Sequence, residues 1–192
     1  MVLSKAKLEM DEIDRKIVSI LERDPEISQN AIAQQVGISQ PSVGVRIRKL
    51  KKMGIISTSL GINFKKSGLY LAKVDCTATN TINILRQFEK CPYFLNGFVI
   101  AGKNNLCLFF VSEDIATLEA IVDGHFRCNP DIQTVDFGIV ITSNKDQILP
   151  IKLEVEKADK APCDANCGEC SYYDLDRCLG CPVTGHYRGS FW

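Results

Sequence analysis

Five cysteines lie within the last thirty residues at spacings that suit metal ligands. They follow the pattern Cys-x3-Cys-x2-Cys-x7-Cys-x2-Cys, and they are Cys163, Cys167, Cys170, Cys178 and Cys181. Each Cys-x2-Cys turn directs both sulfur atoms to one side, so two such turns can bring four thiolates to one metal. The first residues contain no apolar leader, so nine cysteines in this chain favour metal binding over disulfides. The sequence therefore predicts a metal-binding tail over residues 163–192.

The spacing leaves the identity of the metal open between zinc and an iron–sulfur cluster. A tetrahedral zinc site needs four thiolates, those of Cys167, Cys170, Cys178 and Cys181, and leaves Cys163 over. A 4Fe–4S cluster also takes four thiolates, and the grouped first three cysteines with the final Cys-Pro are faintly similar to ferredoxin runs. A third interpretation is a metal-free thiol switch in which the fifth cysteine is the resolving partner.

The other cysteines and both histidines are predicted to stand outside this site. His186 follows Cys181 by five residues, but one histidine beside five cysteines is more typical of the protein surface. His125 is expected to cap a helix or to face solvent. Free cysteines commonly pack as small hydrophobic residues, and we expect inert thiols at Cys76, Cys91, Cys107 and Cys128.

A helix-turn-helix pattern spans residues 28–53. Its first helix is predicted to start after the capping residue Ser28, and its second after Ser39. In the second helix an apolar stripe recurs at helical spacing, formed by Val43, Ile47 and Leu50. Five of the seven residues from 46 to 52 are basic, and they are Arg46, Arg48, Lys49, Lys51 and Lys52. These charges must mostly point away from the stripe, and phosphates are their natural partner.

The second helix of such a motif enters the major groove of DNA, with its N-terminal residues nearest the base edges. A basic run can also be a solvated helix face, but its place in a helix-turn-helix favours DNA. The predicted base readers are Gln40, Ser42 and Val43. The other members of the predicted DNA-binding set are Ser39, Arg46, Arg48, Lys49 and Lys52.

The remaining elements follow from hydrophobic periodicity. Residues 11–23 are predicted to form a helix that cores the N-terminal unit, and residues 55–64 a short hairpin wing. From residue 69 the predicted order is strand, helix, strand, strand, helix, strand, which is the ferredoxin-like order with both helices on one face of an antiparallel sheet. Apolar residues on both alternation phases at 106–111 and 137–141 predict that the open face packs against a second subunit.

Composition sets the frame for these elements. A chain of 192 residues with 45% hydrophobic and 24% charged residues has an ordinary globular balance. The formal net charge is zero, yet residues 1–58 carry ten Lys and Arg against seven Asp and Glu. The chain has no run of eighteen apolar residues, so we expect a cytoplasmic protein without a membrane partner. The predicted domains are a winged helix-turn-helix (1–62), a ferredoxin-like domain (63–145), a connector (146–162) and the tail (163–192).

The segment DEIDRKIVSILERDPEISQNAIAQQVGISQPSVGVRIRKLKKMGII, followed by this βαββαβ domain, resembles the Lrp/AsnC family of feast/famine transcription regulators in its archaeal type. The resemblance covers residues 8–145, and its opening motif, Asp-x-Ile-Asp-x-x-Ile before a helix-turn-helix, is specific. It implies an α+β regulator that binds double-stranded DNA, dimerises through the C-terminal sheet and often assembles to octamers. The cysteine tail departs from the family.

The resemblance also implies a small effector, such as an amino acid, bound between dimers. In the family a loop of the form Gly-x-x-Asp lines the pocket, and here it reads Gly102, Lys103, Asn104 and Asn105. The acidic residue is missing, although an asparagine can still accept a hydrogen bond from an amino group.

Three functional hypotheses remain. The first is a DNA-binding regulator whose tail senses metal or redox state. The second is an amino-acid-responsive regulator in which a zinc tail is purely structural. The remote third is an enzyme similar to sirohaem decarboxylases, which share the two-domain plan but need a basic, histidine-bearing pocket, for which the second domain offers His125 alone. We therefore expect a regulator that is not an enzyme.

Overall fold

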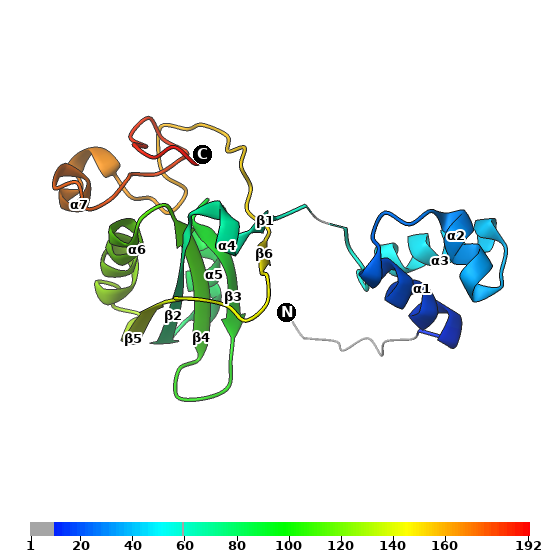
Figure 1. The fold of residues 1–192 in the computed structure, drawn as a ribbon. Coiled ribbons are helices and arrows are strands. Elements are labelled where there is room, and N and C mark those ends of the chain that lie inside the picture. The colour runs from blue at the N-terminus through cyan, green and yellow to red at the C-terminus, as the bar shows by residue number, and fades with distance from the viewer. Residues whose placement is uncertain (1–9, 59) are drawn as a thin grey trace. The chain divides into compact units, whose positions relative to one another are not determined.

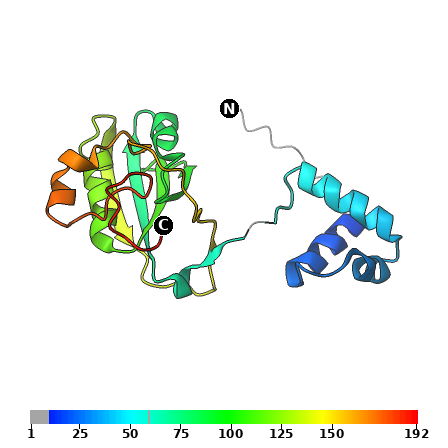
Figure 2. The same ribbon diagram turned by 90° about the horizontal axis from the view of Figure 1, so that it is seen from above.

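The computed structural model describes residues 10–58 and 60–192. These residues divide into two compact units, the first ending at residue 59 and the second beginning at residue 60. The first unit is helical, as the blue-to-cyan ribbon in Figures 1 and 2 shows, whereas the second contains the sheets and the tail. Within the described residues, no helix is both long enough and apolar enough to cross a membrane.

The first unit is built from α1 (Glu12–Arg23), α2 (Gln29–Val36) and α3 (Gln40–Lys52). α1 begins in a reciprocal capping box between Asp11 and Asp14. Ser28 caps α2 and Ser39 caps α3, each by accepting a hydrogen bond from a backbone N–H in the first turn. The predicted helices, including the helix over residues 11–23, are confirmed.

Aliphatic side chains from all three helices form the core of this unit. Its buried members are Ile17, Ile32, Ala33, Val43 and Ile47. The stripe predicted along the second helix of the motif is confirmed, because Val43, Ile47 and Leu50 of α3 are all buried. Each fully buried aliphatic side chain contributes about 1.5–3 kcal/mol to stability, so the stripe fixes which face of α3 turns inward.

An ion pair ties α1 to α3. Nη1 of Arg46 lies 2.6 Å from Oδ2 of Asp11 and 2.7 Å from Oδ1 of Asp14. The Asp14 side chain is only 4% exposed, so its charge depends on this partner. Hydrogen bonds from the Asp14 N–H and from Arg46 lower the pKa of Asp11, and the two carboxylates raise the pKa of Arg46.

Among the described residues 55–58 and 60–64, the predicted wing does not form a hairpin of its own. Residues 55–58 contain no strand, and the N–H of Ile55 closes onto the carbonyl of Leu50 at 3.0 Å. Ile62–Asn63 (β1) pairs antiparallel with Ile148–Leu149 (β6), far along the chain. The apolar residues of this segment serve two different units, which explains why their alternation resembled a hairpin. Ile56 packs on the core of the first unit, whereas β1 belongs to the second.

The second unit has the predicted βαββαβ order. Its elements are β2 (Tyr70–Ala78), α5 (Thr81–Phe88), β3 (Phe94–Val99), β4 (Leu106–Ser112), α6 (Ile115–Val122) and β5 (Ile132–Ile139). The strand order is β3-β4-β2-β5 with every neighbouring pair antiparallel, so Val74 of β2 lies between Leu108 and Phe137. The ferredoxin-like fold is confirmed. A short helix α4 (Phe64–Ser67) precedes it, and a π-helical turn η1 (Asp123–Arg127) extends α6.

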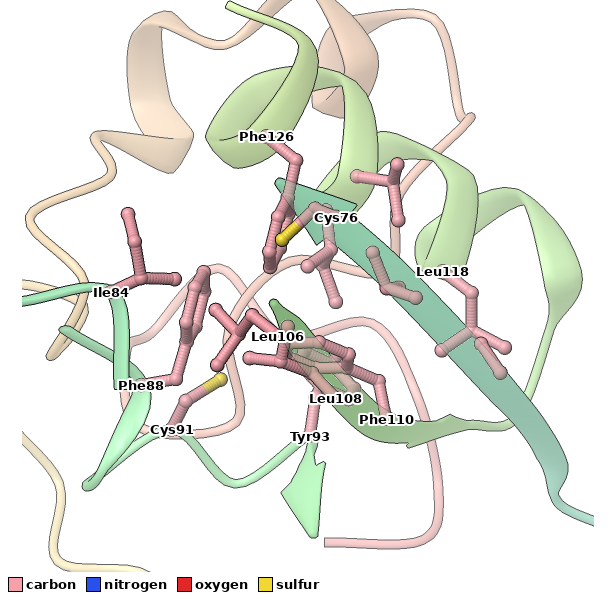
Figure 3. Close-up of a cluster of buried hydrophobic side chains, with 14 of the residues drawn as sticks. Cys76, Ile84, Phe88, Cys91, Tyr93, Leu106, Leu108, Phe110, Leu118 and Phe126 are labelled. Atoms are coloured by element: carbon pink, nitrogen blue, oxygen red, sulfur yellow. The ribbon is translucent and has the colours of Figure 1, made fainter. Parts of the chain in front are cut away.

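The main core lies between the sheet and the two helices α5 and α6. Figure 3 shows its labelled members, with Phe88 of α5 and Phe126 of η1 facing the strands. The Phe88 ring stacks on Phe126 with centroids 5.2 Å apart and meets Phe110 edge-on at 5.2 Å. Such aromatic pairs stabilise the core beyond the free energy gained by burying their apolar surface. Both helices therefore cover the same face of the sheet, as predicted.

The other face of the sheet is partly covered by the chain itself. Leu71 and Val111 pack there against Phe64 of α4 and Leu149 of β6. This second core explains why β4 is apolar on both alternation phases without a partner subunit. Packing against a second subunit stays a prediction for the part of the face around Phe98, whose side chain is 49% exposed.

The cysteine tail contains a 3-10 turn η2 (Cys167–Glu169) and a one-turn helix α7 (Ser171–Asp174). It belongs to the same compact unit as the sheet, and both views show it beside α6 (Figures 1 and 2). The N–H of Leu179 donates to Oγ1 of Thr117 in α6 at 2.8 Å, and the Tyr93 hydroxyl donates to the Gly180 carbonyl. Thus the tail packs on the ferredoxin-like domain.

The last residues of the tail are held by Glu113. Its carboxylate accepts hydrogen bonds from the N–H and the hydroxyl of Ser190, both at 2.8 Å, and from the Tyr187 hydroxyl. Burial raises the pKa of Glu113, but these hydrogen bonds outweigh it and hold the pKa below the ordinary 4.5. Trp192 then packs edge-on against Tyr93, with ring centroids 5.1 Å apart.

Replacing Asp14 by Ala should destabilise the helix-turn-helix unit. We expect a loss of about 2 kcal/mol, below the cost of breaking a fully buried pair because Arg46 is 30% exposed. Hydrogen exchange of peptides from α1, α2 and α3 in the full chain measures it. Lys16→Ala, which removes a solvent-exposed ion pair of α1, is the matched control and should leave exchange unchanged. Equal exchange in the two variants would show that the buried pair contributes nothing.

Acid should release the end of the tail. Because the folded pKa of Glu113 is lowered, its hydrogen bonds stabilise the docked tail above the unfolded pKa, and this contribution is lost as pH falls through the folded pKa. We expect the fluorescence of the single tryptophan, Trp192, to report its exposure as the pH falls below the ordinary glutamate pKa of 4.5. Glu113→Gln should remove that transition, and Glu119→Gln, which removes a half-exposed pair with Arg177, should keep it. An unchanged transition in Glu113→Gln would refute the assignment.

Candidate nucleic-acid interface and metal centre

α3 presents one exposed face opposite its buried stripe. Ser42, Val45, Arg48, Lys49 and Lys52 are all exposed, and their spacing of three or four residues places them along that face. A polar start followed by cations matches a helix that reads bases at its N-terminus and binds phosphates further along. Three of the predicted phosphate contacts therefore share this face, and they are Arg48, Lys49 and Lys52.

Two members of the predicted DNA-binding set are turned inward instead. The Val43 side chain is fully buried in the helical core, so it cannot reach a base edge. Arg46 is bound to Asp11 and Asp14, so its guanidinium is engaged within the unit and its predicted phosphate contact is not supported. Sequence reasoning counted the charge of Arg46 without its partners, because those partners lie on another helix.

The first residues of α3 are exposed but already hydrogen-bonded. Ser39 caps the helix, with its hydroxyl 2.8 Å from that of Ser42. Nε2 of Gln40 donates to Oε1 of Gln29 on α2 at 2.9 Å. This hydrogen bond to α2 can fix the orientation of the Gln40 side chain. The Gln40 amide still has one N–H and its carbonyl oxygen free to bind a base edge.

Sequence reasoning missed Val45. Its side chain is 56% exposed in the middle of the basic face, where an apolar residue has no packing role within the unit. An apolar side chain in the major groove can contact the methyl group of thymine. The signal was present in the sequence, because Val45 lies off the Val43, Ile47 and Leu50 stripe.

All five tail cysteines line one cavity of about 510 Å³. Its wall is completed by the ferredoxin-like domain, through Phe88 of α5, Tyr93 before β3, and Ile121 of α6. Cys91, predicted to be inert, also lines the cavity. The tail thus does not enclose the site alone, and a sixth thiol reaches it from the domain core. Cys76, Cys107 and Cys128 are free thiols outside this cavity.

The six thiols surround the cavity and do not converge on one point. In residues 10–58 and 60–192, no three His, Cys, Asp or Glu side chains approach closely enough to hold a single metal ion. Four sulfur atoms around one zinc, each at 2.3 Å from the metal, lie roughly 3.8 Å apart. A cluster binds its thiolates on separate iron atoms and so accepts a wider ring of cysteines.

Backbone N–H groups point at several of these sulfur atoms. The N–H of Gly180 donates to Sγ of Cys178 at 3.4 Å. Burial raises the pKa of Cys181 to about 11, while hydrogen bonds from Val183 and Thr184 act to lower it. Burial likewise raises the pKa of Cys163, and the N–H of Ala165 acts in the opposite direction. N–H donors of this kind favour thiolates and tune bound metal groups.

His125 takes a different place from the one predicted. The half-buried ring of His125, in the last turn of η1, meets Phe88 edge-on at 5.5 Å and lines the cavity, whereas a capping or solvent-facing place was predicted. Burial lowers the pKa of His125, which favours the neutral ring. His186 packs on Tyr173 with ring centroids 5.5 Å apart and does not line the cavity, and its place outside the ligand set stays a prediction.

The predicted effector loop between β3 and β4 is tied to the neighbouring strands. Asn105 exchanges hydrogen bonds with the N–H and the carbonyl of Ala78 at 2.9 and 2.7 Å, so its amide is occupied. The carbonyl of Lys103 accepts from the Thr77 hydroxyl at 2.9 Å. Nδ2 of Asn104 donates to Asp136 of β5 at 3.3 Å. The carboxylate of Asp136 on β5 therefore lies beside Asn104 of this loop.

Known proteins match both units. The family described as winged helix-turn-helix DNA-binding matches residues 10–57. The transcriptional regulator LrpC of Bacillus subtilis is 29% identical over 67% of this chain and 90% of its own length. About a third of this chain lies outside that match.

Solved structures share the fold. The structure of Escherichia coli AsnC superposes with a TM-score of 0.62 at 18% identity, covering 71% of this chain and 95% of that one. A regulator from Neisseria meningitidis, NMB0573 in complex with L-Met, superposes with a TM-score of 0.60 at 16% identity over 76% and 97% of the two chains. The relatives are named as transcription regulators, which agrees with the prediction of a protein that is not an enzyme. The helix-turn-helix, the antiparallel α+β domain and these matches make the chain similar, over both units, to DNA-binding transcription regulators of the Lrp/AsnC type.

Proposed function

We propose that the chain is a DNA-binding transcription regulator of the Lrp/AsnC type, and that its cysteine tail senses a metal group, zinc or an iron–sulfur cluster, or its redox state. One observation carries the proposal: five tail cysteines line a single cavity whose remaining wall belongs to the ferredoxin-like domain. Thiolates at this spacing suit both metals. A site built across the tail and the domain couples metal occupancy to how firmly the two are joined.

The signal passes through contacts that a bound metal stabilises. Cys178 and Gly180 lie in the stretch that hydrogen-bonds to Thr117 of α6 and to Tyr93 beside β3. Loss of the metal loosens this stretch, and the ferredoxin-like domain then occupies a second arrangement. If two chains pair through the sheet face around Phe98, that change alters how two recognition helices are presented to DNA. The homodimer, and any octamer built from it, belongs to this proposal.

DNA binding rests on the exposed face of α3 within this proposal. Ser42 and Val45 face the bases, together with Gln40 at the helix start, and the phosphates are bound by Arg48, Lys49 and Lys52. Arg46 is left out of this set because its charge is neutralised by Asp11 and Asp14.

A second candidate is a regulator that responds to an amino acid and carries a structural zinc. The observation in its favour is Asp136, which lies within hydrogen-bond distance of Asn104 and can meet an amino group beside Gly102 and Lys103. The Neisseria neighbour was solved with L-Met. Amino acids that change DNA affinity while metal removal leaves it unchanged would favour this candidate.

Arg48→Ala should weaken binding to a DNA duplex of arbitrary sequence. Loss of one phosphate contact reduces the slope of log affinity against log salt by about 0.9. Fluorescence anisotropy with a labelled duplex over a salt series measures this slope. The matched control is Arg46→Ala on the same helix, which should leave the slope unchanged and reduce stability instead. Equal slopes for Arg48→Ala and the native chain would remove Arg48 from the interface.

Changing both Cys167 and Cys170 to Ser should abolish metal binding and the response of DNA affinity to metal. Only three of the five tail thiolates then remain, so the tail no longer supplies four ligands to zinc or to a cluster. Metal content per chain and duplex affinity, measured before and after chelation, test this. Cys128→Ser, which removes an exposed cysteine outside the cavity, is the control. A double variant that keeps both the native affinity and its metal response would refute sensing by the tail.

A further inference from the structure

Cys91 reaches the cavity from the core of the ferredoxin-like domain. It lies in the tight turn between α5 and β3, where its N–H donates to the Phe88 carbonyl at 2.9 Å and its carbonyl accepts from the Phe94 N–H at 3.1 Å. Figure 3 shows its side chain beside that of Phe88. The backbone position of Cys91 is therefore set by the fold of the domain, independently of the tail.

The surroundings of Cys91 are unusual for an inert core cysteine. Cys163 and Cys181 of the tail line the same cavity as Cys91, although 72 residues separate Cys91 from Cys163 in sequence. Cys76, in the same core, does not line it. The tail docks so that its own thiols and the thiol of Cys91 share one space.

The shape of that space decides which metal group fits it. Six thiols line a volume of about 510 Å³, and among the described residues no three ligand side chains approach one point. A single zinc ion requires such a point, whereas a cluster of several iron atoms fills a volume between spaced thiolates. Phe88, Tyr93 and Ile121 form an apolar wall that limits access of water to a bound cluster.

We propose that the cavity holds an iron–sulfur cluster and that Cys91 is one of its thiolate ligands, together with cysteines of the tail. This inference rests on the proposed metal binding by the tail and specifies its nature. Each thiol releases its proton to solvent as its sulfur binds iron. The cluster then joins the turn between α5 and β3 to the tail through iron–sulfur bonds, so that the tail is held by the metal as well as by hydrogen bonds.

The test compares Cys91→Ala with Cys76→Ala in the full chain. Both residues are buried cysteines of one core, but Cys76 does not line the cavity. Each protein is purified without oxygen and supplied with ferrous iron and sulfide. Iron and sulfide per chain, the visible spectrum, the electron paramagnetic resonance of the reduced sample and the rate of iron loss to a chelator are measured. Circular dichroism and duplex binding confirm that the variants are folded.

We expect the native chain and Cys76→Ala to hold the same cluster, and Cys91→Ala to lose iron at least about tenfold faster with an altered resonance signal. Native-like iron, spectrum and loss rate in folded Cys91→Ala would overturn the ligand role of Cys91. One zinc per chain and no iron in the native protein would overturn the cluster but leave metal binding by the tail intact. No metal at all in the native chain would refute the proposed function itself.

Discussion

The tail cannot fold on its own, and the rest of its structure follows from that constraint. Thirty residues with a 3-10 turn and a single helical turn bury too little apolar surface for an independent core. The tail therefore packs on α6 and on the start of β3, where it forms hydrogen bonds with Thr117, Tyr93 and Glu113. Because the docking surface is the helical side of the domain, the exposed part of the opposite sheet face stays available for a second chain.

The cations of α3 have two different roles, since one forms an ion pair within the unit and others are exposed to solvent. Arg46 lies two residues from Arg48, yet the first is paired with Asp14 and the second faces solvent. A period of 3.6 residues turns neighbouring side chains to different directions. The basic run in the sequence therefore contains one residue that holds α1 to α3 and several that remain free to meet a polyanion.

Local periodicity was sufficient to predict the helices, the strand order and the cysteine tail, because caps, apolar stripes and Cys-x2-Cys turns act over a few residues. What it missed depends on contacts between distant segments. The pairing of Arg46 with α1, the strand pairing of β1 with β6 and the approach of Cys91 to the tail leave no local pattern. Val43 was assigned to base reading although it belongs to the apolar stripe of α3. Its burial could have been predicted from that stripe.

The small sheet of β1 and β6 connects two segments that are remote in sequence. β1 lies just after the helix-turn-helix unit, and β6 lies where the chain turns toward the tail. Ile62 faces Leu149 across this ladder, and the Phe64 N–H donates to the Gln147 carbonyl at 2.8 Å. The strand that follows the helix-turn-helix and the strand that precedes the cysteine tail are thus hydrogen-bonded to each other in one small sheet. The segment that leads to the tail is therefore tied to residues 62–64 by backbone contacts.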